Sequence, residues 1–231
     1  MTEIGTVLLP GLDGTGSMLM EFAAALQEFT DVRVIRYPPS ELWDYDALLD
    51  FVRPQLPDTP HVVIGESFSG PLALRLARER PPGLKGIVLG ASFARLDIPL
   101  KKVLAGLAGA ISPRMVPTEV FAAILLGRWS TAQHRRRLRS ALREVFPEVL
   151  SWRAKAALAV DLVHEGEIGL PILYLRASKD RLIPKSAVDA IGALAPHVQV
   201  REIAAPHFLF QIAPKECAAA VRSYYDSITM D

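Results

Sequence analysis

Residues 61–73 read HVVIGESFSGPLA, and this stretch decides how the rest of the chain is interpreted. An apolar, β-branched run leads into GESFSG (65–70), and a helical pattern follows at once. A strand that turns sharply into a helix strains the residue at the apex, and it brings strand and helix so close that the positions two before and two after must be small. Gly65 and Ser69 are small, although glycine is more usual than serine at the second position. We therefore expect Ser67 to be presented as a nucleophile; the alternative is a Gly/Ser-rich turn without chemistry.

Strand and helix signals alternate on both sides of this turn. Short apolar or β-branched runs predict strands at 4–9, 32–37, 61–64, 86–90, 172–176 and 198–203. Helical patterns occupy 17–29, 44–56, 68–80 and 186–194, and a last helix begins at Pro214. Asp44 is a candidate N-cap of the second helix. Strands separated by helices of this length predict an α/β fold with a mostly parallel central sheet flanked by helices.

The alternation stops between residues 97 and 166. This segment contains no convincing strand and is interrupted by Pro99, Pro113, Pro117 and Pro147. A structureless loop of that length is improbable inside a compact domain, so we expect a helical insertion. The sequence is thus interpreted as one core, residues 1–96 and 167–231, with a helical cap over 97–166.

Composition excludes several classes of protein. The 231 residues include 26 Lys and Arg, 25 Asp and Glu, and one Cys, and half are apolar. The apolar half argues against disorder, and one Cys provides neither a disulfide framework nor a thiolate cluster for zinc. A balanced charge argues against a dedicated nucleic-acid binder. The start of the chain lacks targeting features and no apolar run is long enough to span a membrane, so we expect a cytoplasmic protein. We also expect it to work without a metal or cofactor.

Two further residues complete a candidate set for nucleophilic catalysis. A serine hydroxyl needs a base, and the base needs an orienting acid. Asp180 lies just beyond the predicted strand 172–176, and His207 lies just beyond the strand 198–203. Parallel α/β sheets place their active sites at this end of the strands. The chain order Ser67, Asp180, His207 is that of the α/β-hydrolase arrangement.

Other candidates for the base and the acid are less well placed. The remaining histidines lie at a strand start, in an arginine run, in the insertion and before the last strand; they are His61, His134, His164 and His197. Asp97 follows the strand ending near residue 90 and remains an alternative acid.

The loop LLPGLDGTGS (8–17) is rich in glycine and could bind a nucleotide or an oxyanion. It lacks the lysine of a Walker loop and the spacing of a dinucleotide-binding loop, which disfavours a nucleotide. An oxyanion needs two preorganised N–H donors. We expect one from Phe68, directly after the nucleophile, and the other from Leu12. Asp13 is expected to form a turn with no direct chemical role.

With these motifs in place, the chain resembles the α/β-hydrolase superfamily over nearly its whole length. The resemblance rests on LLPGLDGTG, GESFSG, SKDRLIP and PHFLF, although the usual His-Gly of the first loop is Pro10-Gly11 here. The form of that loop is similar to that of plant chloroplast esterase/acyltransferases. The resemblance implies a helical cap over the pocket. A serine at the turn argues against the branches that attack with aspartate.

The predicted cap divides into an apolar and a basic half. Its apolar stretches, 103–116 and 120–127, either line an acyl pocket or pack the cap on the core. Residues 98–143 include nine basic residues and one acidic residue, so this segment is strongly positive and the rest of the chain is negative. Four arginines are candidate contacts for a substrate or carrier: Arg135, Arg136, Arg137 and Arg139. The basic face is either solvated or a dock for an anionic acyl carrier, as in the pimeloyl-carrier methyl esterases that the chain resembles.

The sequence thus predicts a cofactor-independent serine hydrolase that cleaves carboxylic esters through an acyl-enzyme, with medium-chain or carrier-linked acyl groups as candidate substrates. An acyltransferase or thioesterase would use the same three residues, and perhydrolysis would share the site. A non-catalytic binding module is the alternative from another class.

Overall fold

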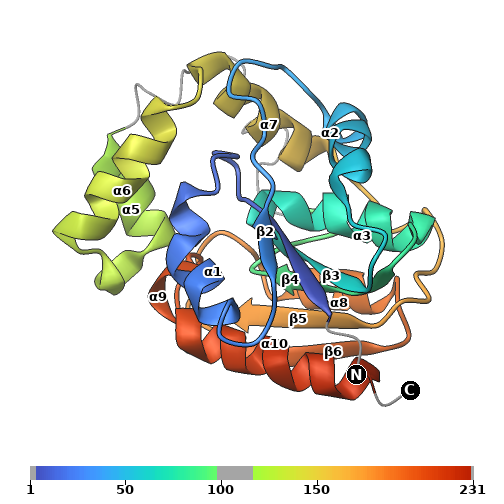
Figure 1. The fold of residues 1–231 in the computed structure, drawn as a ribbon. Helices are drawn as coiled ribbons and strands as arrows, with labels where there is room; N and C mark the ends of the chain where they lie inside the picture. The colour runs from blue at the N-terminus through green and yellow to red at the C-terminus, as the bar shows by residue number, and fades with distance from the viewer. Residues whose placement is uncertain (1–3, 98–116, 230–231) are drawn as a thin grey trace.

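The computed structural model describes residues 4–97 and 117–229. In this part of the chain, six parallel strands form one sheet in the order β2-β1-β3-β4-β5-β6 (Figure 1). The strands are β1 (Gly5–Leu9), β2 (Val32–Val34), β3 (His61–Glu66), β4 (Leu84–Gly90), β5 (Ile172–Ala177) and β6 (Val198–Ile203). The predicted α/β class with a parallel sheet is confirmed.

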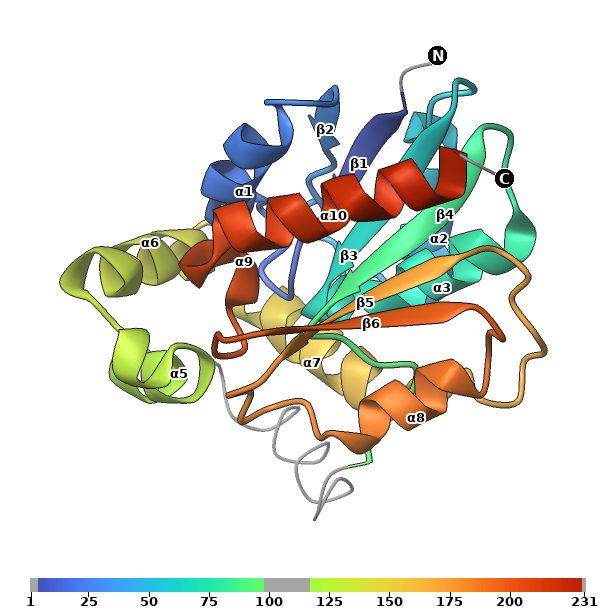
Figure 2. The same cartoon turned by 90° about the horizontal axis from the view of Figure 1, so that it is seen from below.

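Helices cover both faces of the sheet, as Figure 2 shows. One face packs on α1 (Met20–Leu26), α9 (Leu209–Ile212) and α10 (Pro214–Thr229), and the other on α2 (Tyr45–Val52), α3 (Gly70–Glu79) and α8 (Ser186–Gly192). Successive side chains of a strand point to opposite faces of the sheet, so each face has its own apolar core. Because both faces are buried, these strands are nearly continuous apolar runs. The described residues include no helix long and apolar enough to cross a membrane.

Three further helices lie beyond the carboxyl ends of the strands (Figures 1 and 2). They are α5 (Thr118–Leu125), α6 (Ala132–Arg143) and α7 (Pro147–Ala159). Pro147, which we expected to interrupt the insertion, opens α7 because the first turn of a helix needs no N–H there. The described residues of 97–166 form no strand, but Asp161 makes an isolated bridge to Arg95. The division into core and cap stays our interpretation.

Element boundaries differ from prediction where polar contacts compete with the sheet. The second strand ends at Val34 and not at Tyr37, because the Tyr37 N–H donates to the Gly14 carbonyl instead of to β1. The first helix begins as a 3₁₀ turn at Ser17 and becomes α-helical at Met20. Helix α9 was not expected from the sequence. The Asp44 carboxylate caps α2 as predicted and accepts the N–H groups of Asp46 and Ala47.

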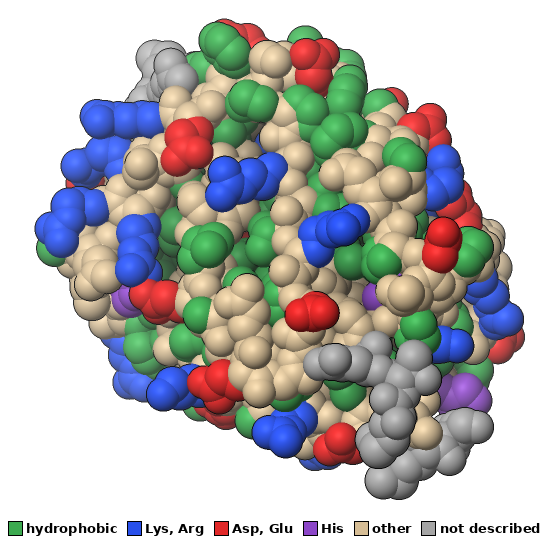
Figure 3. Space-filling view, in the orientation of Figure 1, with side chains coloured by type: hydrophobic (Ala, Val, Ile, Leu, Met, Phe, Trp, Pro, Cys, Tyr) green, Lys and Arg blue, Asp and Glu red, His purple; other side chains and the backbone are tan. Residues whose placement is uncertain are grey.

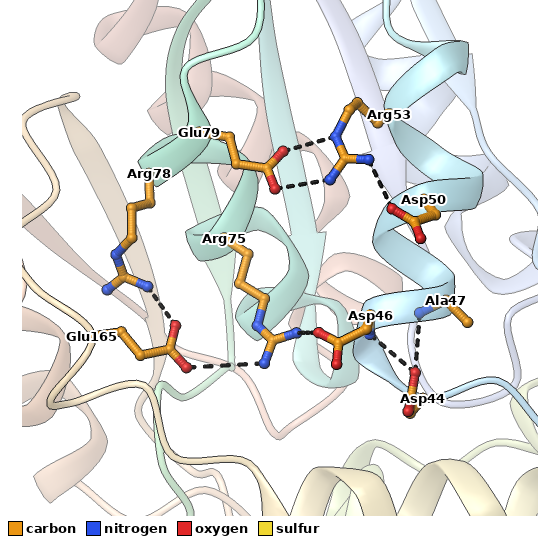
Figure 4. Close-up of polar contacts among 9 residues, drawn as sticks. All are labelled: Asp44, Asp46, Ala47, Asp50, Arg53, Arg75, Arg78, Glu79 and Glu165. Carbon is orange, nitrogen blue, oxygen red and sulfur yellow. Dashed lines mark hydrogen bonds and ion pairs between the residues drawn. The ribbon is translucent and has the colours of Figure 1, made fainter.

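Ion pairs join α2, α3 and the chain after α7 on the outer surface (Figure 4). Arg53 donates to Glu79 at 2.8 Å, Arg75 pairs with Asp46, and Arg78 donates to Glu165 at 2.7 Å. Such partly exposed pairs each contribute about 0.2–1 kcal/mol, so they hold these elements in register more than they stabilise the fold.

Some sequence predictions fall on residues outside the described part of the chain. These are the apolar stretch 103–116 and the basic residues Lys101, Lys102 and Arg114.

Candidate active site

Ser67 lies at the apex of a strained turn between β3 and α3. Its backbone angle φ of 47° is in the left-handed region, which residues other than glycine rarely adopt. The close approach of strand and helix explains the small neighbours, because a Cβ added at Gly65 would lie 2.7 Å from the Ser69 carbonyl oxygen. A Cβ at Gly70 would overlap the Ser92 hydroxyl. The turn therefore has the strain and the crowding that the sequence predicted for it.

The structure brings Ser67, His207 and Asp180 into one hydrogen-bonded row. The Ser67 Oγ lies 2.9 Å from His207 Nε2, and His207 Nδ1 lies 2.9 Å from Asp180 Oδ2. His207 is buried, while Ser67 is partly exposed. Each residue follows the carboxyl end of its own strand, β3, β5 or β6. These strands are parallel, and only β4 separates β3 from β5, so their carboxyl ends lie at the same edge of the sheet.

Backbone groups orient the acid of this row. The other oxygen of Asp180, Oδ1, accepts the N–H groups of Leu182 at 2.7 Å and Ile183 at 3.0 Å. The Lys179 N–H donates to the Ala205 carbonyl at 3.0 Å and ties the two loops together. A carboxylate held this way presents one fixed oxygen to the imidazole. It favours the tautomer that carries its proton on Nδ1, which leaves Nε2 as an acceptor for the serine hydroxyl.

Side chains from distant parts of the sequence hold the strained turn. The Ser92 hydroxyl donates to the Ser67 carbonyl at 2.6 Å, and the Tyr174 hydroxyl donates to the Ser92 carbonyl at 2.8 Å. The Tyr45 hydroxyl donates to the Phe68 carbonyl at 2.8 Å. Sequence reasoning missed these residues, since no local pattern marks them.

The glycine-rich loop after β1 lies against this turn. Within it, the Gly14 N–H donates to the Gly11 carbonyl at 3.0 Å, and the Gly11 N–H donates to Glu66 Oε2 at 3.1 Å. In the part of the chain that the structure describes, the N–H groups of Leu12 and Phe68 donate no hydrogen bond.

Ser69 shows why serine suits the position at which glycine is usual. Its hydroxyl donates to the Pro10 carbonyl and so ties the turn to the glycine-rich loop. Since that proton is used, the Tyr37 hydroxyl donates to Ser69 Oγ, at 2.6 Å. Burial raises the pKa of Tyr37 and keeps it a neutral donor.

A buried carboxyl group lies directly behind the nucleophile. Glu66 Oε1 accepts from Gln211 Nε2 at 2.7 Å, and Oε2 accepts from Gly11. Burial raises the pKa of Glu66 to about 7. No motif in the sequence marks a role for Glu66, whose contacts with Gln211 and Gly11 depend on the tertiary structure.

Asp13 has more contacts than a simple turn former. Its Oδ1 accepts the Thr15 N–H at 2.9 Å and the Thr15 hydroxyl, as expected for a turn. Its carbonyl also accepts from Arg153 of α7 at 2.9 Å.

The alternative bases and acid make no hydrogen bond to Ser67 among the described residues. His61 is buried at the start of β3, His134 bonds the Trp129 carbonyl at 3.1 Å, and His197 precedes β6. His164 is exposed. Asp97 is exposed and pairs with Arg95 at 2.8 Å.

The four candidate arginines lie on α6, in the region where basic side chains gather at the left of Figure 3. Arg137 pairs with Glu21, Arg139 with Glu119 at 3.1 Å, and Arg135 donates to the Ser130 hydroxyl at 3.1 Å. Arg136 and Arg143 are exposed and make no ion pair among the described residues.

The described residues include no group of three or more His, Cys, Asp or Glu side chains that could hold a metal ion.

Comparison with known proteins places this arrangement among hydrolases. The model of the family described as serine aminopeptidase, S33, matches residues 41–210. The biotin biosynthesis bifunctional protein BioHC of Cellvibrio japonicus is 25% identical over 204 residues, which cover 83% of this chain and 40% of that protein. The chain thus spans about two fifths of this curated relative.

Solved structures show the same fold. A hydrolase from Oleispira antarctica is similar with a TM-score of 0.83 and 16% identity, over 100% of this chain and 93% of that one. A thermophilic esterase from Thermogutta terrifontis has a TM-score of 0.83 and 19% identity, over 98% and 91%. The enol-lactonase of Burkholderia xenovorans has a TM-score of 0.77 and 17% identity, over 100% and 93%.

Proposed function

Because the chain belongs to the serine aminopeptidase S33 family of the α/β-hydrolase superfamily, we propose that it is a carboxylic ester hydrolase that works through an acyl-enzyme on Ser67. The observation that carries the proposal is the row from Ser67 Oγ through His207 to Asp180, with 2.9 Å at each step.

In the proposed reaction, Ser67 Oγ attacks the ester carbonyl while His207 Nε2 takes its proton. Asp180 holds the ring and stabilises the imidazolium. The N–H groups of Leu12 and Phe68 bind the oxyanion of the tetrahedral intermediate. When this intermediate collapses, the bond to the alcohol oxygen breaks and His207 protonates the leaving alcohol. His207 then removes a proton from water, which attacks the acyl-enzyme and releases the carboxylic acid.

The first test replaces the nucleophile. We expect Ser67→Ala to lower kcat for p-nitrophenyl esters by about 10⁴-fold or more with an unchanged melting temperature. Ser223→Ala, an exposed serine on α10, is the matched control and should behave as wild type. Undiminished turnover by the Ser67 variant, or failure of wild type to react with a fluorophosphonate, would refute the assignment.

The substrate panel separates related activities. Esters of increasing acyl length give the preferred chain, and an aminoacyl p-nitroanilide tests the peptidase activity after which the family is named. A thioester tests thioesterase activity. Product analysis with and without an alcohol acceptor distinguishes hydrolysis from acyl transfer.

A second proposal concerns the carrier of the acyl group. Arg136, Arg139 and Arg143 are spaced three and four residues apart, so they share one side of α6. The free charges of Arg136 and Arg143 support docking of an anionic acyl carrier, since a positive surface steers such a partner toward the site.

The contacts of α6 show which arginines can be reversed without disturbing the fold. Arg136→Glu with Arg143→Glu breaks no internal ion pair among the described residues. We expect kcat/KM for a carrier-linked methyl ester to fall about tenfold or more and that for a small ester to stay within twofold. Lys85→Glu with Arg201→Glu, both exposed on other elements, is the charge-matched control. An equal fall in kcat/KM for the two substrates would contradict docking of a carrier on α6.

A further inference from the structure

Arg153 of α7 is a buried cation that the proposed reaction does not use. Only 2% of its surface is exposed, and among the described residues it forms no ion pair. The Asp13 carboxylate attracts this charge without forming an ion pair with it. A buried charge without a direct ion pair is costly unless hydrogen bonds compensate it. Burial lowers the pKa of Arg153 from its ordinary value, but an arginine remains charged at neutral pH.

The guanidinium is compensated by three backbone carbonyl groups. Nη1 donates to the Leu12 carbonyl at 3.1 Å and to the Asp13 carbonyl at 2.9 Å, and Nη2 donates to the Pro38 carbonyl at 2.9 Å. The planar fork of arginine can serve three acceptors in one fixed arrangement, which the ammonium of lysine cannot reproduce.

The loop is shaped to receive this side chain. A Cβ at Gly14 would overlap Arg153 Nη1, so the glycine at this position makes room for the guanidinium. The guanidinium carbon also lies 5.5 Å from the centre of the Tyr37 ring, which provides a cation–π contact.

These contacts bracket the Leu12 N–H. On one side, Gly11 is held through its N–H by Glu66 and through its carbonyl by Gly14. On the other side, the carbonyls of Leu12 and Asp13 are held by Arg153. Every one of these bonds restricts rotation of the peptide groups next to the Leu12 N–H. An oxyanion donor works only if it is held in place before charge develops.

We propose that Arg153 is a positioning residue, which fixes the Leu12 N–H for the oxyanion and adds a buried positive charge beside the site. Arg153 would then give helix α7 a role in positioning the site. This inference rests on the proposed function, since it concerns the same ester hydrolysis.

Two variants separate the fork from the charge. Arg153→Lys keeps a positive charge and loses the fork, and Arg153→Gln loses both. Lys155→Gln, an exposed residue two positions later on α7, is the matched control for loss of a positive charge from this helix. We expect kcat to fall about tenfold for Arg153→Lys and about 10²-fold for Arg153→Gln, with KM within threefold of wild type and Lys155→Gln unchanged.

Inhibitors supply a readout that loss of stability alone would not move. A trifluoromethyl ketone forms a tetrahedral adduct with a negatively charged oxygen, whereas an uncharged ether analogue of the substrate, which has no carbonyl group, does not. We expect affinity for the ketone to fall in parallel with kcat/KM across the variants and affinity for the ether to stay constant. If Arg153→Gln yields no folded protein, Arg153→Lys provides the same comparison.

The outcomes distinguish this inference from the proposed function. Inactive Ser67→Ala together with Arg153 variants of wild-type kcat, or variants that lose both inhibitors equally, would overturn the positioning role alone. Active Ser67→Ala would overturn the proposed function itself.

Discussion

Ser69 links the strained turn to the glycine-rich loop through one hydroxyl group. We expect Ser69→Ala to lower the free energy of unfolding by about 1–3 kcal/mol, because the buried Pro10 carbonyl and Tyr37 hydroxyl lose their partner. Tyr37→Phe removes the other end of the same network. In a double-mutant cycle measured by urea unfolding, the double variant should lose less than the sum of the two single variants. Additive losses would show that the two hydroxyls are not coupled.

Glu66 should make stability depend on pH in a direction opposite to that of an ordinary ion-paired carboxylate. Its pKa in the folded protein is about 7, against an ordinary value of 4.5, so the folded protein holds a proton that the unfolded chain releases. This contribution to stability is complete below about pH 4.5 and is lost as the pH rises through about 7.

Glu66→Gln tests this pH dependence because the amide cannot ionise. Gln211 Oε1 is buried without a partner among the described residues, so it can accept from the new amide after its own side chain turns over. Between pH 5 and pH 8 the unfolding free energy of wild type should fall by about 2–3 kcal/mol relative to that of the variant. Parallel stability curves for the two proteins would contradict a raised pKa.

At the scale of elements, the packing of β3, α3 and the chain after β4 sets the position of the nucleophile. Gly70→Ala would drive a methyl group into Ser92, whose hydroxyl holds the Ser67 carbonyl. We expect a loss of about 2–4 kcal/mol in unfolding free energy and a lower kcat.

Gly192→Ala is the control for this substitution. A Cβ at Gly192, the last residue of α8, meets nothing within 4 Å. This variant should unfold within about 1 kcal/mol of wild type, since alanine favours helix over glycine. Similar thermal and urea unfolding of the two alanine variants would show that the contact at Ser92 yields easily.

The order of elements was predictable because each strand carries its own signal. Apolar β-branched runs bounded by Gly and Pro placed all six strands, and β6 has the predicted ends, Val198 and Ile203. Boundaries were less predictable where a polar contact ends the element. Tyr37 continues an extended pattern in the sequence, but its N–H bonds Gly14, so the ladder stops at Val34.

At the scale of the whole molecule, the balanced net charge conceals a positive surface on α6 (Figure 3). If this surface receives an anionic carrier, kcat/KM for a carrier-linked ester should fall about tenfold or more between 50 and 300 mM salt, because salt screens charges beyond a few ångströms. A small neutral ester should change less than twofold under the same conditions. Equal salt dependence of the two substrates would argue against steering.

The sequence by itself determined the α/β class and the three residues of the candidate row. Ser67, Asp180 and His207 each follow a strand signal in a local motif, and parallel strands necessarily deliver their carboxyl ends to one edge of the sheet. Only the tertiary structure decided what holds these residues and the glycine-rich loop beside them. Arg153 reaches Leu12 across 141 positions, and Ser92 reaches Ser67 across 25. Contacts between groups so far apart leave no periodicity or spacing in the chain, because they depend on how the elements pack.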